Sequence, residues 1–286
     1  MKKVLIVGGD MRNVALANEF RKRGNPPLVC GIGKDYVSDS GKFTEEFQKA
    51  LSESEIIILP LPVTKDGESI NTPLYDGVLS LKDVSAYAPK DAFIFGGMTE
   101  KIKELGDFPY ACDYAKRDDF ATLNAVPTAE GAILEVMKIL PITLFASNVI
   151  VTGFGRCARI LALTLKNLGA NVTVCARSLK DLSFAHSLGL KTIKLSEMHL
   201  YLPRADAIFN TVPKKIFGAR ELDAIRESTP FADIASYPGG LDCDEAKTRG
   251  INYLFLPALP GKYSPVTAGQ IIYKTITNIL ETRQSD

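Results

Sequence analysis

A short glycine-containing segment near the middle of the chain restricts the possible folds more than any other stretch. A largely β-branched run, 148–152, leads into Gly153-Phe154-Gly155-Arg156-Cys157-Ala158, and apolar residues at helical spacing follow. This order of strand, tight turn and helix is typical of the opening of a nucleotide-binding βαβ unit. Gly153 permits the turn, Gly155 lets the backbone approach a pyrophosphate, and Ala158 allows close packing of the helix. The segment predicts a dinucleotide site at Gly153, Phe154, Gly155, Arg156 and Ala158.

The end of the next predicted strand, 172–176, indicates which dinucleotide is bound. NAD enzymes usually place Asp or Glu there, to accept a hydrogen bond from the ribose 2′-hydroxyl. This chain has Arg177 and Ser178 instead, with Lys180 close behind. A cation and a hydroxyl suit a 2′-phosphate, so these residues favour NADP over NAD. The alternative is a structural turn with solvated charges.

Two later loops should flank the nicotinamide ribose of such a cofactor. Each ends a predicted strand of the second half, so both belong to the carboxyl edge of a parallel sheet. Because Pro and Gly punctuate ordinary turns as well, simple turn chemistry is the alternative. The residues expected here are Thr211, Val212, Pro213 and Ser236.

Composition excludes several other classes of function. Lys and Arg total 34 against 33 acidic residues, a net charge of +1, and no long block of like charge occurs. We therefore expect neither nucleic-acid nor membrane binding, and we expect a cytoplasmic protein. The five cysteines lack C-x-x-C spacing and the two histidines lack metal-ligand spacing, so reduced thiols and no metal site are expected.

The alternation of strands and helices predicts an α/β protein with two doubly wound parallel-sheet domains and a cleft between them. The first glycine loop, Gly8-Gly9-Asp10, lacks a third glycine position, so the N-terminal half is predicted to be flavodoxin-like. Residues 120–126 are predicted as its last extended piece, and Thr128 as the cap of a connecting helix. The predicted parts are a substrate domain at 1–126, the connecting helix at 127–142, a Rossmann NADP-binding domain at 143–266, and a helix at about 267–286 that returns to the first domain.

Several further segments carry a family resemblance, because they follow one another in order over nearly the full length. They are Gly8-Gly9-Asp10-Met11-Arg12, Arg117-Asp118-Asp119, Val126-Pro127-Thr128-Ala129-Glu130-Gly131, Gly153-Phe154-Gly155-Arg156, Ala176-Arg177-Ser178, Pro238-Gly239-Gly240, and Leu259-Pro260-Gly261 leading to Thr267-Ala268-Gly269-Gln270. Together they resemble the A subunit of dipicolinate synthase, an enzyme family of endospore-forming bacteria. Two positions depart from the family pattern: Tyr237 and Val266 stand where the family often carries an arginine and a lysine.

The resemblance implies a fold similar to that of D-2-hydroxyacid and alanine dehydrogenases. It also implies NADP-dependent oxidation of a dihydrodipicolinate-level intermediate of the lysine pathway to pyridine-2,6-dicarboxylate during sporulation. The implied setting is the mother-cell cytoplasm, and the implied partner is a flavoprotein-like B subunit. We also expect a homo-oligomer.

This chemistry requires groups that hold two carboxylates and a group that accepts a proton. Arg12 and Arg117 are the candidates for carboxylate binding, and Lys262 is a further cation that can substitute for the lysine replaced by Val266. Glu130 is the first candidate for the proton acceptor, since it is predicted in the first turn of the connecting helix. Asp118 is the second candidate, and Asp10 and Asp119 are weaker ones.

Each of these assignments has an alternative. The arginines could be exposed or ion-paired with Asp10 or Asp118, and the helix dipole alone favours an acidic residue at the predicted place of Glu130. Two other functions also remain open: an NADPH-dependent reductase of a small keto or imino acid, and a non-catalytic NADP-binding subunit that organises a partner enzyme.

Overall fold

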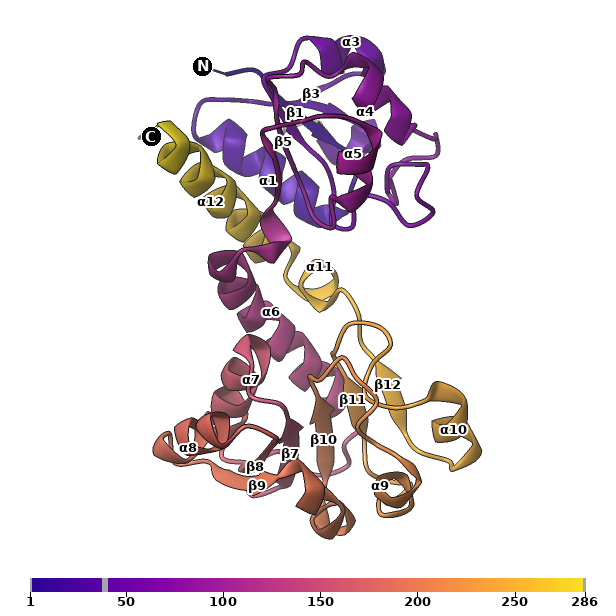
Figure 1. The fold of residues 1–286 in the computed structure, drawn as a ribbon, viewed down its shortest axis with the longest axis vertical. Helices are drawn as coiled ribbons and strands as arrows, with labels where there is room; N and C mark the ends of the chain where they lie inside the picture. Colours follow the sequence, from indigo (N-terminus) through magenta and orange to yellow (C-terminus); the bar gives the residue numbers. More distant parts are fainter. Residues whose placement is uncertain (1, 38–40, 285–286) are drawn as a thin grey trace. The chain divides into compact units, whose positions relative to one another are not determined.

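The protein is described by a computed structural model that covers residues 2–37 and 41–284 (Figure 1). The chain forms two compact units. The first comprises Met1–Leu123 together with Ser264–Asp286, and the second comprises Asn124–Tyr263. Among the described residues, no helix is both long enough and apolar enough to cross a bilayer.

The first unit contains a six-stranded parallel sheet of order β3-β2-β1-β4-β5-β6. Its inner strands are continuous apolar runs, such as Val-Leu-Ile-Val in β1, because helices cover both faces. The strands are β1 Val4–Val7, β2 Leu28–Cys30, β3 Lys42–Phe43, β4 Ile56–Ile58, β5 Phe93–Gly96 and β6 Ala111–Asp113, and the helices between them are α1 Met11–Lys22, α2 Lys34–Val37, α3 Phe47–Ser52, α4 Leu81–Tyr87 and α5 Glu100–Leu105. This strand order is that of dinucleotide-binding folds and differs from the 2-1-3-4-5 order of flavodoxin, so the prediction of a flavodoxin-like half is corrected.

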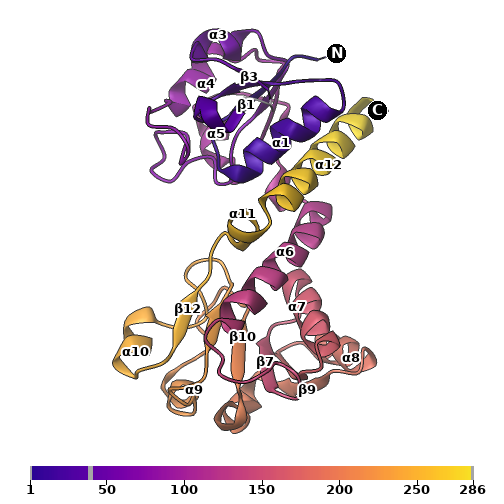
Figure 2. The ribbon, with the colours of Figure 1, turned by 180° about the vertical axis from the view of Figure 1, so that it is seen from behind.

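The last helix, α12 (Pro265–Gln284), belongs to the first unit and packs along α1 (Figure 1, Figure 2). Its buried isoleucines, including Ile272 and Ile276, join the same core as Phe20 of α1. Gly269 permits the close approach, because a Cβ there would lie 2.6 Å from the carbonyl oxygen of Arg12. One face of the sheet is thus covered by the two ends of the chain.

The second unit repeats this architecture, with strand order β12-β11-β10-β7-β8-β9, all parallel (Figure 2). Its strands are β7 Asn148–Thr152, β8 Asn171–Ala176, β9 Lys191–Lys194, β10 Ala207–Asn210, β11 Phe231–Asp233 and β12 Tyr253–Phe255, and its helices include α7 Arg156–Asn167, α8 Leu179–Ser187, α9 Ala219–Asp223, α10 Cys243–Thr248 and α11 Leu259–Tyr263. From β7 the chain first adds β8 and β9 on one side and then returns to add β10, β11 and β12 on the other side. The direction in which strands are added therefore reverses between β7 and β10. Ligands of such sheets bind at the carboxyl edge beside this reversal.

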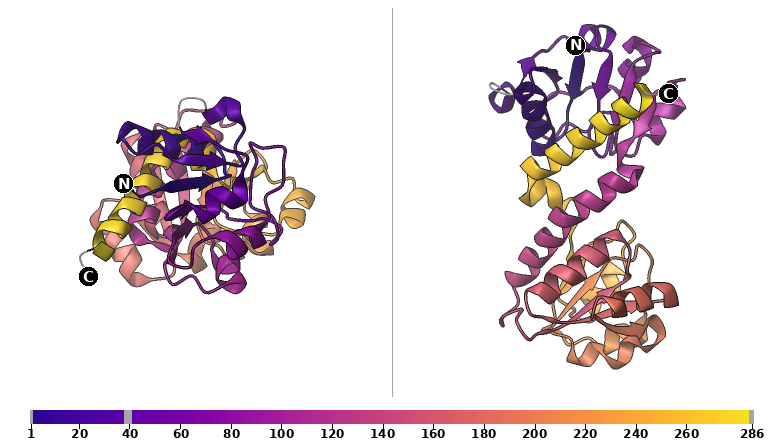
Figure 3. Two further views of the ribbon diagram at one scale, coloured as in Figure 1. Left: turned by 90° about the horizontal axis from the view of Figure 1, so that it is seen from above. Right: turned by 90° about the vertical axis from the view of Figure 1, so that its left-hand side faces the viewer.

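The helix α6 (Asp118–Met137) corrects one prediction (Figure 3). Residues 120–126 are helical, not extended, and the last strand of the first unit is β6. Asp118 and Asp119 provide the acidic first turn that a helix N-terminus favours. Pro127 therefore lies inside the helix instead of at its start. Thr128 does not cap the helix, since its hydroxyl donates to the carbonyl of Asn124 at 2.7 Å.

Candidate functional site

The glycine turn after β7 has the geometry of a pyrophosphate site. Gly153 has φ +86°, and a Cβ there would lie 2.6 Å from Thr211 Oγ1, so only glycine fits. Gly155 is the N-cap of α7, and a Cβ at this position would meet nothing within 4 Å. No side chain caps the first turn of α7. Open space in front of helical N–H groups is what an anion requires, and the fully buried Ala158 lets α7 pack on the sheet.

A pocket of about 400 Å³ continues from this turn over the end of β8. It brings together several residues that the sequence singled out, from three different segments of the second unit. Those predicted residues are Gly153, Phe154, Arg177, Ser178 and Val212. The pocket also includes Cys175, Ala176, Asp181 and Leu195, which were not predicted.

Arg177 is exposed at the mouth of this pocket and makes no hydrogen bond or ion pair with any described residue. Ser178 is the N-cap of α8, and its Oγ accepts a hydrogen bond from the backbone N–H of Asp181 at 3.4 Å. Lys180 is exposed but does not line the pocket. One uncommitted guanidinium therefore stands where the sequence predicts a 2′-phosphate.

Sequence inspection missed Asp181, which lines the pocket, and Arg159, which pairs with it. The Nε of Arg159 donates to the carbonyl of Phe154 at 2.8 Å, and its Nη2 lies 3.5 Å from Asp181 Oδ1. The guanidinium also lies 5.5 Å from the ring centroid of Phe154 and 5.0 Å from that of Phe184. Arg159 thus offsets the only carboxylate among the residues that line the pocket. Its position next to Ala158 in the glycine motif was the signal available in the sequence.

The remaining cofactor candidates lie around the same sheet edge without lining the pocket. Arg156 begins α7. The hydroxyl of Thr211 donates to the carbonyl of Thr152 at 2.7 Å, and Pro213 follows in the same loop. Ser236 is exposed after β11, and its carbonyl accepts from the N–H of Gly239 at 2.9 Å.

Beneath these loops lies a buried polar network, also missed from the sequence. Thr152, Asn210 and Asp233 end neighbouring strands and are fully buried. The hydroxyl of Thr152 donates to Asn210 Oδ1 at 2.6 Å, and Asn210 Nδ2 donates to Asp233 Oδ1 at 2.8 Å. A polar residue at the end of each apolar strand was the available signal. The network ties the carboxyl ends of β7, β10 and β11 together.

In the first unit, Arg12 is almost fully buried and pairs with Asp10. Its Nε lies 2.9 Å from Asp10 Oδ1, its Nη2 lies 2.9 Å from Asp10 Oδ2, and Nη2 also donates to the carbonyl of Leu61 at 2.7 Å. Burial opposes ionisation of Asp10, yet its bonds to Arg12 hold its pKa below the ordinary value. The ion pair with Asp10 that the sequence offered as an alternative is therefore present.

Arg117 and the acid candidates lie on or beside α6. Arg117 is exposed and pairs with Asp119, at 2.9 Å from Nε to Oδ1, and not with Asp118 as one alternative had it. Asp118 is the first residue of α6. Glu130 is exposed but lies in the middle of this helix, so the expected first-turn position is wrong and the helix dipole does not account for it.

Lys262 belongs to a cluster that joins α11 to α6 within the second unit. Its Nζ lies 2.5 Å from Glu135 Oε1, and Tyr263 also donates to this carboxylate. Lys138 Nζ donates to the hydroxyl of Tyr263 at 2.8 Å. The hydrogen bonds from Lys262 and Tyr263 lower the pKa of Glu135 to about 2. The ammonium predicted to hold substrate is thus engaged with Glu135.

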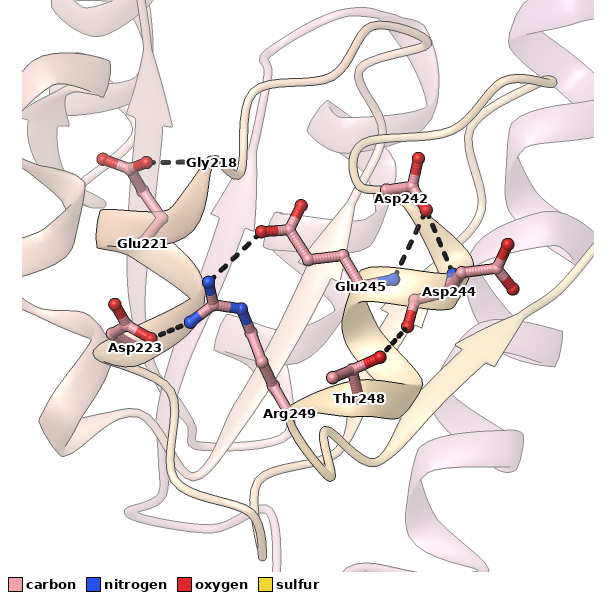
Figure 4. A network of polar contacts seen from close by, with 8 residues as sticks. All are labelled: Gly218, Glu221, Asp223, Asp242, Asp244, Glu245, Thr248 and Arg249. Carbon is pink, nitrogen blue, oxygen red and sulfur yellow. Dashed lines mark hydrogen bonds and ion pairs between the residues drawn. The ribbon is translucent and has the colours of Figure 1, made fainter.

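In the acid-rich patch around α9 and α10, the carboxylates of Asp223, Asp242 and Glu245 are bound by protein groups (Figure 4). Asp242 caps α10 by accepting from the N–H groups of Asp244 and Glu245, at 3.1 and 3.3 Å. Arg249 pairs with Asp223 and, at 3.3 Å, with Glu245. Within the described ranges, no group of three or more His, Cys, Asp or Glu residues is placed to hold a metal ion.

Two low-identity structural matches identify the fold. The chain matches a transhydrogenase from Sinorhizobium meliloti with a TM-score of 0.72 at 13% identity, over 98% of this chain and 94% of the other. It matches an L-alanine dehydrogenase with a TM-score of 0.66 at 14% identity, over 96% and 88%. The predicted α/β class with two doubly wound parallel sheets is confirmed, and the fold is that of NAD(P)-binding dehydrogenases.

Higher similarity is found to A subunits of dipicolinate synthase. Residues 3–106 match the family model of the N-terminal domain of the dipicolinate synthase A subunit. The chain is 29% identical to the A subunit of dipicolinate synthase from Bacillus subtilis (strain 168), over 99% of this chain and 97% of that protein. The crystal structure of the A subunit from Bacillus halodurans matches with a TM-score of 0.88 at 26% identity, over 98% and 97%, and that from Bacillus subtilis with 0.88 at 28%, over 99% and 97%. From its N-terminal domain to its overall fold, the chain is thus similar to the A subunits of dipicolinate synthase.

Proposed function

We propose that this protein is the NADP-dependent A subunit of a dipicolinate synthase, which oxidises a dihydrodipicolinate-level intermediate to pyridine-2,6-dicarboxylate. The observation that carries the proposal is similarity to dipicolinate synthase A subunits over nearly the whole chain. The open helix N-terminus at Gly155 and the uncommitted Arg177 supply a place for the coenzyme. As part of this proposal, the enzyme works in the mother-cell cytoplasm of a sporulating bacterium, as a homo-oligomer with a flavoprotein-like B subunit.

The coenzyme would be held by groups of the second unit. The N–H groups of the first turn of α7, beside Gly155, face the pyrophosphate. Arg177 and Ser178 bind the 2′-phosphate, and Arg159 limits the repulsion that Asp181 would exert on it. The other cofactor candidates, Arg156, Lys180, Thr211, Val212, Pro213 and Ser236, surround the same edge. When bound, the coenzyme accepts the hydride, and the protein supplies orientation.

The substrate carboxylates would be held by arginines of the first unit. Nε and Nη2 of Arg12 donate to Asp10 and Leu61, which leaves the hydrogens of Nη1 for a substrate carboxylate. Asp10 and the Leu61 carbonyl fix the guanidinium plane before substrate arrives, so little side-chain entropy is lost on binding. Arg117 is the candidate for the second carboxylate, and Lys262 would contribute only if it left Glu135.

The proton released in the oxidation needs an acceptor. We propose Glu130, an exposed carboxylate on α6, with Asp118 at the start of the same helix as the second candidate. Formation of an aromatic ring already makes the oxidation favourable. A modest base is therefore sufficient, and positioning is the main requirement.

The fold itself favours one competing function. Because the chain shares its fold with an L-alanine dehydrogenase, reduction of a small keto or imino acid with NADPH is the second candidate. A third, non-catalytic role would leave the chemistry to a partner enzyme.

One assay separates these three functions. Purified chain is given NADP⁺ and freshly generated dihydrodipicolinate, and both NADPH and dipicolinate absorbance are followed. The proposal predicts equal amounts of the two products from the chain alone. Product that forms only when the B subunit is added would favour the non-catalytic role, and turnover of pyruvate or glyoxylate with NADPH would favour the reductase.

A further inference from the structure

The carboxylate of Asp233, at the end of β11, is fully buried and accepts four hydrogen bonds. Oδ1 accepts from Asn210 Nδ2 at 2.8 Å and from the N–H of Ala235 at 3.2 Å. Oδ2 accepts from the N–H of Gly240 at 2.7 Å and from the hydroxyl of Tyr253 at 3.2 Å. Two of the donors are backbone amides, which can only donate, so this arrangement fits an ionised carboxylate.

The orientation of the two side-chain donors is fixed by their surroundings. Asn210 Oδ1 accepts from the backbone N–H of Val212 at 3.1 Å, which directs its Nδ2 to Asp233. Burial, and secondly the charge of Asp233, raises the pKa of Tyr253, so the phenol keeps its proton. The four groups that donate hydrogen bonds to Asp233 are therefore all neutral.

No lysine, arginine or histidine of the described chain lies within ion-pair distance of Asp233. A buried carboxylate without a cationic partner is uncommon, because leaving water costs free energy that an opposite charge normally offsets. The negative charge nevertheless has a defined place. It lies at the carboxyl edge of the sheet, directly under the loop 236–240.

Two glycines allow the backbone of the loop 236–240 to lie close to Asp233. A Cβ on Gly239 would lie 2.7 Å from Asp233 Oδ2, and one on Gly240 would lie 2.4 Å from Asn210 Nδ2. The two glycines thus let the backbone lie directly over the buried polar side chains. In a doubly wound sheet the two halves of a dinucleotide lie on either side of the first strand. With the adenosine half over β8, the nicotinamide half falls over β10, β11 and this loop.

We propose that Asp233 acts as a fixed negative charge beneath the nicotinamide subsite, which makes the protein bind the oxidised coenzyme more tightly than the reduced one. This inference rests on the proposed function, because it requires a nicotinamide coenzyme. The oxidised ring carries a positive charge and the reduced ring is neutral, while the remainder of the molecule is the same. A buried charge thus distinguishes the two redox states. Through several ångströms of protein the preference amounts to roughly tenfold in affinity.

This preference suits an enzyme that must begin its cycle with the oxidised coenzyme. Since reduction removes the positive charge, the attraction to Asp233 disappears when the hydride has been transferred. Release of the reduced coenzyme is then easier than release of the oxidised one. Asp233 is thus a positioning and electrostatic residue and does not touch the reacting atoms.

The test compares the dissociation constants of NADP⁺ and NADPH, measured by calorimetric titration. Wild-type protein should bind NADP⁺ roughly tenfold more tightly than NADPH, and Asp233→Asn should bring the two constants close together. Equal affinities in the wild type, or an unchanged ratio in a folded Asp233→Asn protein, would overturn the inference. The wild-type ratio decides the matter even if Asp233→Asn does not fold.

Two matched variants distinguish the effect of the charge of Asp233 on coenzyme binding from its effect on protein stability. Tyr253→Phe removes one hydrogen bond and keeps the carboxylate, so its melting temperature should fall while the NADP⁺ to NADPH ratio stays. Asp181→Asn changes a carboxylate at the adenosine end, which both coenzymes share, so it should alter both affinities by the same factor. Should neither coenzyme bind wild-type protein, the proposed function fails, which is a different result from binding without a redox preference.

Discussion

Arg177 and Asp181 carry opposite charges and line the same pocket of the second unit. Their surroundings determine which of the two is available to a ligand. Asp181 is offset by Arg159, whereas Arg177 has no partner among the described residues. A 2′-phosphate can therefore bind the free guanidinium without first breaking an ion pair. The proposed selectivity for NADP would consequently depend on single residues and not on the fold.

Replacing Arg177 tests this selectivity. Arg177→Ala should weaken NADPH binding at least tenfold, because a charge-assisted contact with phosphate is lost, and should change NADH binding little. Equilibrium titrations with both coenzymes measure the effect. Arg204→Ala, which removes an exposed arginine at the opposite edge of the same sheet, is the matched control and should leave both affinities unchanged. Equal losses for NADPH and NADH in Arg177→Ala would refute the 2′-phosphate assignment.

The two arginines proposed to hold the substrate should respond differently to truncation. Arg117→Ala should raise the KM for the dicarboxylate about tenfold or more and leave NADPH affinity intact, since the exposed pair with Asp119 contributes little to stability. Arg12→Ala should raise this KM as well, but it also leaves Asp10 partly buried without its partner, so unfolding becomes easier. Steady-state kinetics together with thermal melts distinguish the two effects. Unchanged kinetics in both variants would remove these arginines from the substrate site.

At the scale of elements, the two glycines in the turn between β7 and α7 have different roles: one is needed for folding, and the other is proposed to allow coenzyme binding. Gly153 is needed for the backbone conformation and for contact with Thr211, whereas the space beside Gly155 is open in the protein itself. The sequence alone predicted the turn at Gly153 and the approach of a pyrophosphate to Gly155, but it could not reveal the contact of Gly153 with Thr211.

Alanine substitutions at the two glycines should therefore behave in opposite ways. Gly153→Ala should destabilise the protein by about 1–3 kcal/mol, since alanine is strained at this φ and collides with Thr211. Gly155→Ala should keep the wild-type melting temperature yet lose most coenzyme affinity, because the added methyl group occupies the space proposed for the pyrophosphate. Thermal melts and coenzyme titrations provide the readouts. A Gly155→Ala protein that binds coenzyme normally would argue against the proposed phosphate position.

The contact between α6 and α11 predicts a dependence of stability on pH. Because the pKa of Glu135 is lowered from 4.5 to about 2, its bonds to Lys262 and Tyr263 stabilise the fold fully above the unfolded value. This contribution is lost as the pH falls from about 4.5 towards about 2. The difference in unfolding free energy between wild type and Glu135→Gln should thus be largest near neutral pH and shrink across this interval. A pH-independent difference in urea denaturation would contradict the assignment.

The sequence predicted the inner strands of the second unit correctly but placed the start of α6 wrongly. Apolar runs such as 148–152 and 172–176 predicted their strands because burial on both faces leaves a continuous signal. The prediction was wrong for α6, because Pro127 is predicted as the first residue of the helix although it lies in the helix interior. Phe120 packs against Tyr114, with ring centroids 5.2 Å apart, and both belong to the core formed with α1 and α12. This packing favours the helix, and no local pattern reveals it.

At the scale of the whole molecule, the two units share one fold, but their glycine turns differ. Both sheets have the same strand order, yet only the second carries a glycine turn that leaves open space at a helix N-terminus; in the first, a Cβ on Gly9 would meet the side chain of Asn13. The sequence indicated this asymmetry through the missing third glycine. It offered the Asp10 to Arg12 pair only as an alternative. It could not reveal the Arg159 to Asp181 pair or the network around Asp233, because these depend on which side chains the fold brings into contact.

The central claim is that a 2′-phosphorylated nicotinamide coenzyme binds the second unit at the end of β8. Calorimetric titration of the purified protein with NADP⁺ and, separately, with NAD⁺ tests it most directly. The account predicts saturable binding of NADP⁺ with at least tenfold higher affinity than NAD⁺. Absence of heat with both coenzymes, under conditions where the protein is folded, would contradict it.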